Sequence, residues 1–393
     1  MKAKDRRLSE LRSVIKEITP KEAQDLIKDN GASLIDVRDS DEVAQGSPRG
    51  ALRLGRSFLE LRVEDSVPNL EQPVIVMCAG GARSLFAAEA LVGMGYKQVF
   101  SLAGGFNRWK NEGLGFEVPR FLDAKGKERY SRHLLMKEVG EQGQLKLLDS
   151  KVLLIGAGGL GSPSAYYLAA AGVGTIGLVD HDVVDRSNLQ RQIIHTEDRI
   201  GMPKVESAKI AIEALNPDVK VKTYQHKLDV SNVEEIFSQY DVIVDGTDNL
   251  TARYLINDAC VKLGLPNVHA AVYRFDGQIT VFWPAYNKDK SGCYRCMFPE
   301  PPPPELAPSC AEAGVLGVMP GVFGLLQAVE VLKILLDVGE PLVGRQLTYD
   351  ALGGEFYTMK LKPNPKCRYC RDGSVFPGYD EVAEVCASNL GGH

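Results

Sequence analysis

The sequence lacks the features that would direct it to a membrane, to nucleic acid or out of the cell. Its formal net charge is -5, whereas a nucleic-acid partner favours a basic surface. The N-terminus alternates charged residues with leucines, so it has no apolar core like that of a signal peptide. The longest uncharged run, residues 313–329, is interrupted by glycines and a proline and is too short and broken to span a bilayer. We therefore expect a cytoplasmic protein with no nucleic-acid or membrane partner.

A disulfide framework is also unexpected. The chain has 8 cysteines in 393 residues, and in the cytoplasm cysteines are used for metal binding or catalysis more often than for disulfides. A chain of this length can form two or three domains, each with its own hydrophobic core.

The first part of the chain alternates short strands and helices. Thr19 and Pro20 have the residue types of an N-cap and a first helical position. We expect strands over residues 32–37, 74–77 and 99–102 and a helix over residues 83–93. This alternation predicts a parallel sheet covered on both faces. We place the first domain at residues 1–118 and a linker at 119–127, within the polar stretch 113–127.

The remaining chain continues the alternation, starting with a helix near Glu128. The expected strands cover residues 152–155, 176–180, 219–224, 242–246, 267–271 and 279–283. This sheet should begin parallel and end mixed, because residues 277–283 resemble a hairpin strand. Residues 299–311 are too rich in proline for regular structure and are expected to form a functional loop. The second α/β domain is placed at 128–373, with a loosely ordered tail at 374–393.

Cys78 lies in a glycine-rich loop between an expected strand and an expected helix. The loop reads Cys78-Ala-Gly-Gly-Ala-Arg83. Converging backbone N–H groups and the positive end of the helix dipole stabilise an anionic sulfur at such a position. Arg83 can fix the loop or hold an anion. The alternative is an inert cysteine at the end of a buried strand, which is what most single cysteines are.

The loop belongs to a wider pattern that resembles rhodanese domains. Asp36-Val37-Arg38 lies upstream of it, and Leu102-Ala-Gly-Gly-x-x-x-Trp109 lies downstream. The resemblance implies that Cys78 carries a persulfide. The related Cys-x5-Arg phosphatases have one more residue in the loop, so phosphate chemistry is the weaker interpretation. Residues 47–51 read SPRGA where many relatives have HIPGA, a departure that we expect to affect the choice of sulfur donor.

A second glycine-rich turn follows an apolar run and precedes a helix of small residues. The turn consists of Gly156, Gly158, Gly159, Leu160 and Gly161, and the next expected strand ends at Asp180. Glycines permit a tight turn in which backbone N–H groups approach a phosphate, and an acid at the next strand end can accept ribose hydroxyls. By itself this pattern indicates a nucleotide without saying which one.

The polar residues around this turn favour a triphosphate over a dinucleotide. They supply acids at one strand end, cations and amides in the following loop, and an acid and an amide after a later buried strand: Asp180, Asp182, Asn188, Arg191, Gln192, Lys204, Asp248 and Asn249. Carboxylates beside phosphates suit Mg²⁺, and cations along a triphosphate suit nucleotidyl transfer. Any one of these charges alone would ordinarily be a solvated surface residue. An NAD-dependent oxidoreductase would explain the glycines and Asp180 but not the cations or Asp248.

Residues 128–372 closely resemble the MoeB/ThiF adenylyltransferases of the ubiquitin-activating-enzyme-like superfamily, nearest to the molybdopterin-synthase branch. The matching motifs are RYSRH, GAGGLG, NLQRQ, GMPKVES, DGTDN, GQITVF, CYRC, CAEAGV and CRYC. The resemblance implies a Rossmann-like domain that binds ATP and Mg²⁺. Asp180 would contact the ribose, Arg191 and Lys204 the phosphates, and Asp248 the Mg²⁺. It also implies a homodimer in which Arg132 reaches the ATP of the other subunit.

The same resemblance names the second substrate and a metal. The substrate would be the C-terminal Gly-Gly of a small ubiquitin-fold sulfur carrier, adenylated with release of pyrophosphate. Two Cys-x-x-Cys pairs, Cys293 with Cys296 and Cys367 with Cys370, can complete a closed tetrahedral Zn²⁺ site. A redox role is the alternative, but neither pair opens a helix after a strand as that chemistry prefers. Cys310 is the further candidate for a covalent role, since in some relatives a cysteine here bonds to the carrier; this stays open.

These expectations combine into a two-step sulfur-activation enzyme. The second domain adenylates the carrier, and a persulfide on Cys78 then displaces AMP to leave a thiocarboxylate. The sulfur would come from thiosulfate or from the persulfide of a cysteine desulfurase. A carrier for thiamine or cysteine synthesis is an alternative to that for molybdopterin. A scaffold that binds the carrier without catalysis is the alternative outside the enzymes.

Overall fold

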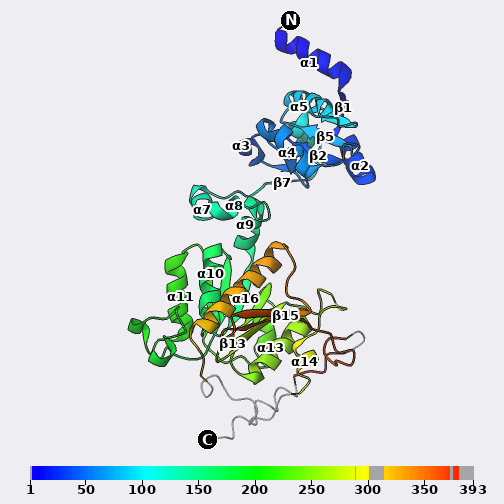
Figure 1. Cartoon of the computed structure of the whole chain (residues 1–393). Coiled ribbons are helices and arrows are strands. Elements are labelled where there is room, and N and C mark those ends of the chain that lie inside the picture. The colour runs from blue at the N-terminus through cyan, green and yellow to red at the C-terminus, as the bar shows by residue number, and fades with distance from the viewer. Residues whose placement is uncertain (1, 288, 301–313, 372–374, 380–393) are drawn as a thin grey trace. The chain divides into compact units, whose positions relative to one another are not determined.

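The computed structural model describes residues 2–287, 289–300, 314–371 and 375–379 (Figure 1). The chain divides into two compact units, Met1–Phe121 and Leu122–His393. Cys310, most of the proline-rich loop and most of the expected tail lie outside the described residues. Residues 113–127, expected as a linker, include a short strand of the first unit and the start of the first helix of the second.

A five-stranded parallel sheet forms the centre of the first unit, with strand order β1-β6-β5-β2-β4. A separate antiparallel pair joins β3 to β7. The elements of this unit are α1 (Ala3–Val14), β1 (Lys16–Ile18), α2 (Pro20–Asn30), β2 (Ser33–Asp36), α3 (Ser40–Val43), β3 (Ser47–Pro48), β4 (Leu52–Arg53), η1 (Arg56–Phe58), α4 (Leu59–Ser66), β5 (Val74–Met77), α5 (Ala82–Gly93), β6 (Val99–Leu102), α6 (Gly105–Asn111) and β7 (Phe116–Glu117).

The central strand β5 is apolar on both faces. Val74 and Val76 belong to one core together with residues of α1, α4 and α5, whereas Ile75 and Met77 belong to another with residues of α2 and α6. Because successive side chains of a strand point to opposite faces, a continuous apolar run needs cover on both sides. The carboxyl end of β5 therefore opens from the middle of a buried sheet, and Cys78 is the next residue.

The second unit contains a mixed eight-stranded sheet, with order β10-β9-β8-β11-β12-β13-β14-β15. The first five strands in this order are parallel and the last three are antiparallel, so the expectation of a sheet that ends mixed is confirmed. The strands are β8 (Lys151–Ile155), β9 (Thr175–Val179), β10 (Lys220–Tyr224), β11 (Val242–Asp245), β12 (Asn267–Tyr273), β13 (Asp276–Phe282), β14 (Arg345–Asp350) and β15 (Glu355–Lys360).

The helices of this unit cover both faces of its parallel strands. They are α7 (Ala124–Arg129), α8 (Ser131–Leu134), α9 (Gly140–Asp149), α10 (Gly161–Ala171), η2 (Arg186–Asn188), η3 (Glu197–Arg199), α11 (Lys204–Leu215), α12 (Val233–Phe237), α13 (Leu250–Leu263), α14 (Tyr294–Met297) and α16 (Val318–Leu336). Residues of α10, α11 and α16 share one buried core with one face of the sheet, and residues of α12 and α13 share another core with the opposite face.

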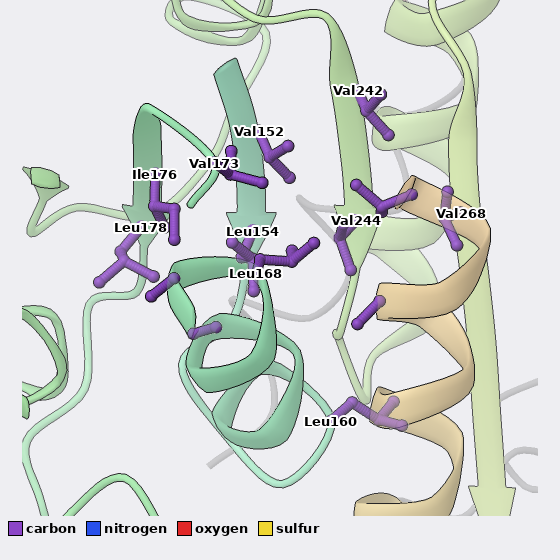
Figure 2. Close-up of a cluster of buried hydrophobic side chains, with 14 of the residues drawn as sticks. Val152, Leu154, Leu160, Leu168, Val173, Ile176, Leu178, Val242, Val244 and Val268 are labelled. Atoms are coloured by element: carbon purple, nitrogen blue, oxygen red, sulfur yellow. The ribbon is translucent and has the colours of Figure 1, made fainter. Parts of the chain in front are cut away.

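Figure 2 shows the first of these cores. Val152 and Leu154 on β8 lie between Ile176 of β9 and Val244 of β11, and Leu168 of α10 packs against them. Their sequence neighbours Leu153 and Ile155 enter the opposite core. Because the side chains of β8 alternate between two buried cores, the strand consists almost entirely of valine, leucine and isoleucine.

The order of the parallel strands reverses at β8. The chain leaves β8 through α10 to β9 and β10 on one side, and then returns to β11 on the other side. Ligands of doubly wound sheets bind in the crevice at the carboxyl ends of the two strands where the order reverses. The glycine turn 156–161 follows β8 and the residues 246–249 follow β11, so both segments lie at this point.

Helix α16 overlaps the uncharged run 313–329 and continues beyond it through Glu330 and Lys333 to Leu336. By length and composition alone it could cross a membrane, but half of its apolar window is buried inside the unit. Phe323 and Val331 are fully buried in the core of the sheet, and Figure 1 shows α16 lying beside α10. These contacts describe a core helix.

Candidate active sites

The Cys78 loop holds its sulfur at the N-terminus of α5. The backbone N–H of Gly81 donates to Cys78 Sγ at 3.1 Å, and the Ser84 hydroxyl oxygen lies 3.6 Å from the same sulfur. Ser84 is itself oriented, because it donates to the Gly81 carbonyl and accepts from Ser101. The cysteine is only 1% exposed. The sulfur is therefore buried, and the Gly81 N–H and the helix dipole suit a negatively charged sulfur.

The backbone of α6 packs directly against this loop. Phe106 N–H donates to the Cys78 carbonyl at 2.8 Å, and Asn107 N–H donates to the Ala79 carbonyl at 3.0 Å. A Cβ atom on Gly105, whose φ is +57°, would lie 2.2 Å from the Cys78 carbonyl oxygen. Only glycine permits this approach, so the downstream Gly-Gly pair holds the cysteine loop in place.

Arg83 does not stand free above the loop. Its guanidinium forms two hydrogen bonds to the carboxylate of Glu42, at 2.7 and 2.5 Å, and Asp39 lies at 3.7 Å. Hydrogen bonding from Arg83 holds the pKa of Glu42 below its usual range. The Arg83 side chain remains 41% exposed. Its charge is thus largely matched by acids of the segment 39–42.

A buried ion pair at the end of β2 holds the segment that contains Glu42. Arg38 donates to both carboxylate oxygens of Asp36 and to the Gly46 carbonyl, and both charged side chains are at most 3% exposed. The Ser47 hydroxyl also donates to Asp36, at 2.8 Å. The serine that replaces the histidine of many rhodanese relatives is therefore part of this buried network rather than a surface substitution.

A cleft lies at the carboxyl ends of β8 and β11, where the strand order reverses. Its empty space, which includes open solvent at the mouth, amounts to about 1170 Å³. Most of the predicted ligand-binding residues line it: Gly156, Gly158, Gly159, Leu160, Asp180, Asp182, Arg191, Gln192, Lys204, Asp248 and Asn249. Sequence segments separated by almost a hundred residues are brought to one site.

The acids of the β9 end organise the cleft in two ways. Asp180 accepts hydrogen bonds from Ala157 N–H and Asp182 N–H, both at 2.9 Å, so it ties the glycine turn to the next loop. Asp182 pairs with Lys204 at 2.8 Å. Partial burial opposes ionisation of Asp182, but the hydrogen bond and charge of Lys204 outweigh it and lower the pKa of Asp182. Lys204 is 6% exposed and starts α11 inside the cleft, where its ammonium group can hold a phosphate.

Other predicted residues have different positions. Asp248 is exposed at the cleft, and Asn249 caps α13 by accepting from Ala252 N–H at 2.8 Å. Three predicted residues are absent from the described lining of the cleft: Gly161, Asn188 and Arg132. Gly161 starts α10 behind the turn, Asn188 ends the short helix η2, and Arg132 is exposed on α8. A role for Arg132 at ATP therefore requires another copy of the chain.

The cleft also contains residues that the sequence did not single out. They are His181, His226, Lys227, Thr247, Thr251 and Arg253. Arg253 donates to the Thr247 carbonyl at 3.0 Å. Arg253 lies five residues after Asp248, in the first turn of α13. Its closeness to Asp248 in the sequence could have identified it as a cleft residue. Lys227 follows β10, whose polar surroundings gave no such signal.

The two Cys-x-x-Cys pairs come together in the second unit. All four sulfur ligand atoms lie within 4.8 Å of one another, with Cys293 to Cys367 at 3.7 Å and Cys296 to Cys370 at 3.4 Å. A tetrahedron with Zn–S bonds of about 2.3 Å has sulfur separations of roughly 3.8 Å, so the cluster fits Zn²⁺. Arg371 donates to Cys370 Sγ at 3.5 Å, an outer contact of the kind that supports metal thiolates.

Comparison with known proteins adds to this geometry. The model of the ThiF family matches residues 130–369, and that of the rhodanese-like domain matches residues 19–112. The chain is 50% identical over 270 residues to the SAMP-activating enzyme E1 of Haloferax volcanii, a match that covers 68% of this chain and 98% of that protein. It is 48% identical over 246 residues to a sulfur carrier protein adenylyltransferase of Thermus thermophilus, covering 62% of this chain and 91% of that protein.

Longer relatives are matched over part of their length. The chain is 51% identical over 249 residues to the adenylyltransferase and sulfurtransferase MOCS3 of Arabidopsis thaliana, which is 63% of this chain and 53% of that protein. Among solved structures, E. coli MccB with ATP has a TM-score of 0.53 at 24% identity, covering 62% of this chain and 74% of MccB. That likeness concerns the fold alone.

Gly105→Ala should destabilise the first unit and reduce sulfur transfer, because the added Cβ meets the Cys78 carbonyl oxygen; overpacking of this kind costs about 1–3 kcal/mol. The chain has 2 tryptophans, so in a Trp283→Phe background Trp109 fluorescence reports urea unfolding of the first unit. Gly93→Ala is the matched control, since a Cβ there meets nothing within 4 Å. Equal stability of the two variants would show that the loop tolerates the approach.

Glu42→Gln should raise kcat/KM for thiosulfate by about threefold to tenfold at low salt, because the uncompensated Arg83 guanidinium then attracts the dianion. The gain should shrink as ionic strength rises. Glu10→Gln is the control, since it removes a carboxylate of the same unit that pairs with Arg7 on α1. An unchanged or lower kcat/KM with Glu42→Gln would mean that the loop depends on the contact between Glu42 and Arg83 more than on an uncompensated Arg83 charge.

Proposed function

The chain belongs to the ThiF family, and on this premise we propose that it is an adenylyltransferase and sulfurtransferase that acts on a small ubiquitin-fold sulfur-carrier protein. The observation that carries the proposal is the cleft in which the glycine turn, Lys204 and Asp248 meet. The names of the Haloferax, Thermus and Arabidopsis relatives support it. So does the rhodanese-like match around Cys78.

In the first step the C-terminal carboxylate of the carrier attacks the α-phosphorus of ATP. A bond forms between carboxylate oxygen and phosphorus, the bond to the β-phosphate breaks, and pyrophosphate leaves. Such a reaction needs positioning and neutralisation of charge. The N–H groups of the glycine turn, Arg191 and Lys204 would hold the phosphates, and Asp180 the ribose. Asp248 would hold Mg²⁺, which neutralises phosphate charge when it is bound.

In the second step the carrier receives sulfur. The mixed anhydride makes the glycine carbonyl electrophilic, and the outer sulfur of a Cys78 persulfide attacks it as AMP leaves. The product is an acyl disulfide, so a second thiol must attack the Cys78 sulfur; this releases the thiocarboxylate and leaves Cys78 in a disulfide, which an external dithiol must reduce before the next turnover. Cys310, outside the described residues, stays a candidate for a covalent bond to the carrier. The persulfide forms when the Cys78 thiolate attacks the outer sulfur of thiosulfate, with sulfite leaving, or that of a desulfurase persulfide.

The proposal includes a homodimer. Arg132 is exposed on α8 and is not among the described residues that line the cleft of its own chain, so it would complete the cleft of a second copy. The carrier is proposed to be the one for molybdopterin, with thiamine or cysteine carriers as alternatives. Incubation with each carrier and mass spectrometry of its C-terminus distinguishes them, because thiocarboxylate formation replaces one oxygen with sulfur.

The two steps should separate in two variants. Asp248→Ala should lower carrier-dependent ATP–pyrophosphate exchange by at least about a hundredfold, because the site loses its metal ligand, while persulfide formation on Cys78 continues. Cys78→Ala should show the opposite pattern, with normal exchange and no thiocarboxylate from thiosulfate. Asp198→Ala, an exposed acid outside the cleft, controls for loss of charge. Undiminished exchange in Asp248→Ala would remove this residue from the mechanism.

Mixing two inactive variants tests the dimer. Arg132→Ala and Asp248→Ala should each lack exchange activity as pure proteins. After co-expression, random pairing gives heterodimers with one intact site, so activity should recover to about a quarter of the wild-type value. No recovery, with heterodimers present by native mass spectrometry, would show that Arg132 does not act across subunits.

A further inference from the structure

The residue beside the first cysteine of the cluster lies close to a residue of the nucleotide cleft. Cys293 caps the short helix α14, which starts at Tyr294. Tyr294 is 3% exposed; burial raises the pKa of its hydroxyl, and the nearby Arg253 guanidinium opposes that rise. Arg253 lines the cleft and donates to the Thr247 carbonyl at 3.0 Å. The side chains of Tyr294 and Arg253 therefore lie between the cysteine cluster and the loop that carries Asp248.

A second contact of Tyr294 leads to the same loop. Its ring meets the ring of His269 edge to face, with centroids 5.3 Å apart. His269 Nδ1 lies 2.7 Å from Asp245 Oδ2. The other carboxylate oxygen of Asp245 accepts from both the N–H and the hydroxyl of Thr247, at 3.0 and 2.7 Å. Asp245 is fully buried, so this carboxylate is the anchor of residues 245–249.

The backbone of the cysteine segment is also fixed to α13. Tyr294 N–H donates to Asn257 at 2.7 Å, and Arg295 forms a buried ion pair with Asp258 at 2.7 Å. Helix α13 begins at the cleft, with Asn249 as its cap. The segment 293–296 thus contacts both α13, which follows the loop 245–249, and His269 of β12, which is paired with Asp245 of that loop.

We propose that the cysteine cluster positions the nucleotide-binding loop 245–249, with Tyr294 and His269 as the positioning residues, so that metal occupancy sets the affinity for ATP. The inference rests on the proposed function, since it assumes that this loop binds ATP with Mg²⁺. A bound metal fixes Cys293 and with it the ring and hydroxyl of Tyr294. Without the metal, Arg253 and the Asp245–His269 pair lose the surface against which they are packed.

The test compares matched tyrosines of one cluster in the full chain. Tyr294→Phe removes only the hydroxyl that meets Arg253, and should weaken ATP binding by about twofold to tenfold in calorimetry and raise KM for ATP with little change in kcat. Tyr369→Phe makes the same chemical change beside the cysteines, where Tyr369 packs on Arg295 and Phe376, and should leave ATP affinity unchanged. Zinc content should be the same in both variants. Equal ATP affinities for the two variants would overturn the proposal.

His269 supplies a rescue experiment. His269→Leu leaves the buried Asp245 carboxylate without its partner and should weaken ATP binding more than Tyr294→Phe does. His269→Asn keeps an N–H donor and should recover most of the affinity. If His269→Leu does not fold, the comparison of Tyr294→Phe with Tyr369→Phe decides. If both His269 variants bind ATP like the wild type, His269 does not position the loop.

Metal removal provides a measurement that does not depend on activity. Hydrogen exchange of residues 245–253 should be faster after chelation of zinc than in the loaded chain, and ATP affinity should fall. Protection that is unchanged in a chelated, folded protein would contradict the coupling. A wild-type chain that does not bind ATP at all would instead contradict the proposed function, so the two failures are distinguishable.

Discussion

The nucleotide cleft depends on how closely backbones approach one another at the carboxyl ends of β8 and β11. A Cβ on Gly161 would lie 2.0 Å from the Gly156 carbonyl oxygen, so α10 begins directly against the turn. Across the core, a Cβ on Gly324 of α16 would lie 2.3 Å from the Leu160 carbonyl oxygen. The Ser164 hydroxyl joins the two helices by donating to the Gly324 carbonyl. The small residues of this region are therefore required by packing, and they aim the N-terminus of α10 into the cleft, where the proposed function places the phosphates.

The first unit also holds a loop by close approach of backbones, but with different elements. There a parallel strand ends at Met77, directly before Cys78, the next helix begins at Ala82, and Gly105 brings α6 against the loop. In both units close backbone contacts help to hold a loop that is a candidate for catalysis or ligand binding. Such contacts leave little freedom for the N–H groups, which suits sites that must present donors to an anion without reorganising.

Local signals predicted much of this fold. Residues 74–77 and 99–102 form β5 and β6 as expected, and Thr19 and Glu22 form the reciprocal cap at the start of α2. Helix α16 was not predicted, because Pro320 and its glycines look like helix breakers when only the sequence is read. The structure places Pro320 in the first turn, where proline is tolerated, and gives Gly324 a packing partner. Strand β14 and the edge strand β15 were also missed; β15 is exposed along its whole length and carries no buried apolar pattern.

The candidate sites divide in the same way. The cleft residues could be predicted because they occur in short motifs directly after strands, where parallel topology gathers them. The cysteine pairs could be predicted from their spacing. The buried polar pairs near the sites could not: Asp36 with Arg38, Asp245 with His269 and Asp258 with Arg295 are recognisable only once burial is known.

These buried pairs share a position that bears on their purpose. The Asp36–Arg38 pair holds the segment 42–46, whose Glu42 pairs with Arg83 of the Cys78 loop, and the other two pairs lie at residues 245–249 and at the segment 293–296. Burying an ion pair adds little net stability compared with apolar residues, yet removing one partner costs about 3–5 kcal/mol because the other charge is left unpaired. An arrangement of this kind penalises any displacement of the loop more strongly than hydrophobic contacts would, since hydrophobic contacts have no direction. We infer that the pairs are kept for the position of the loops, and that the metal cluster, joined to one of them through Tyr294, belongs to the same system of supports.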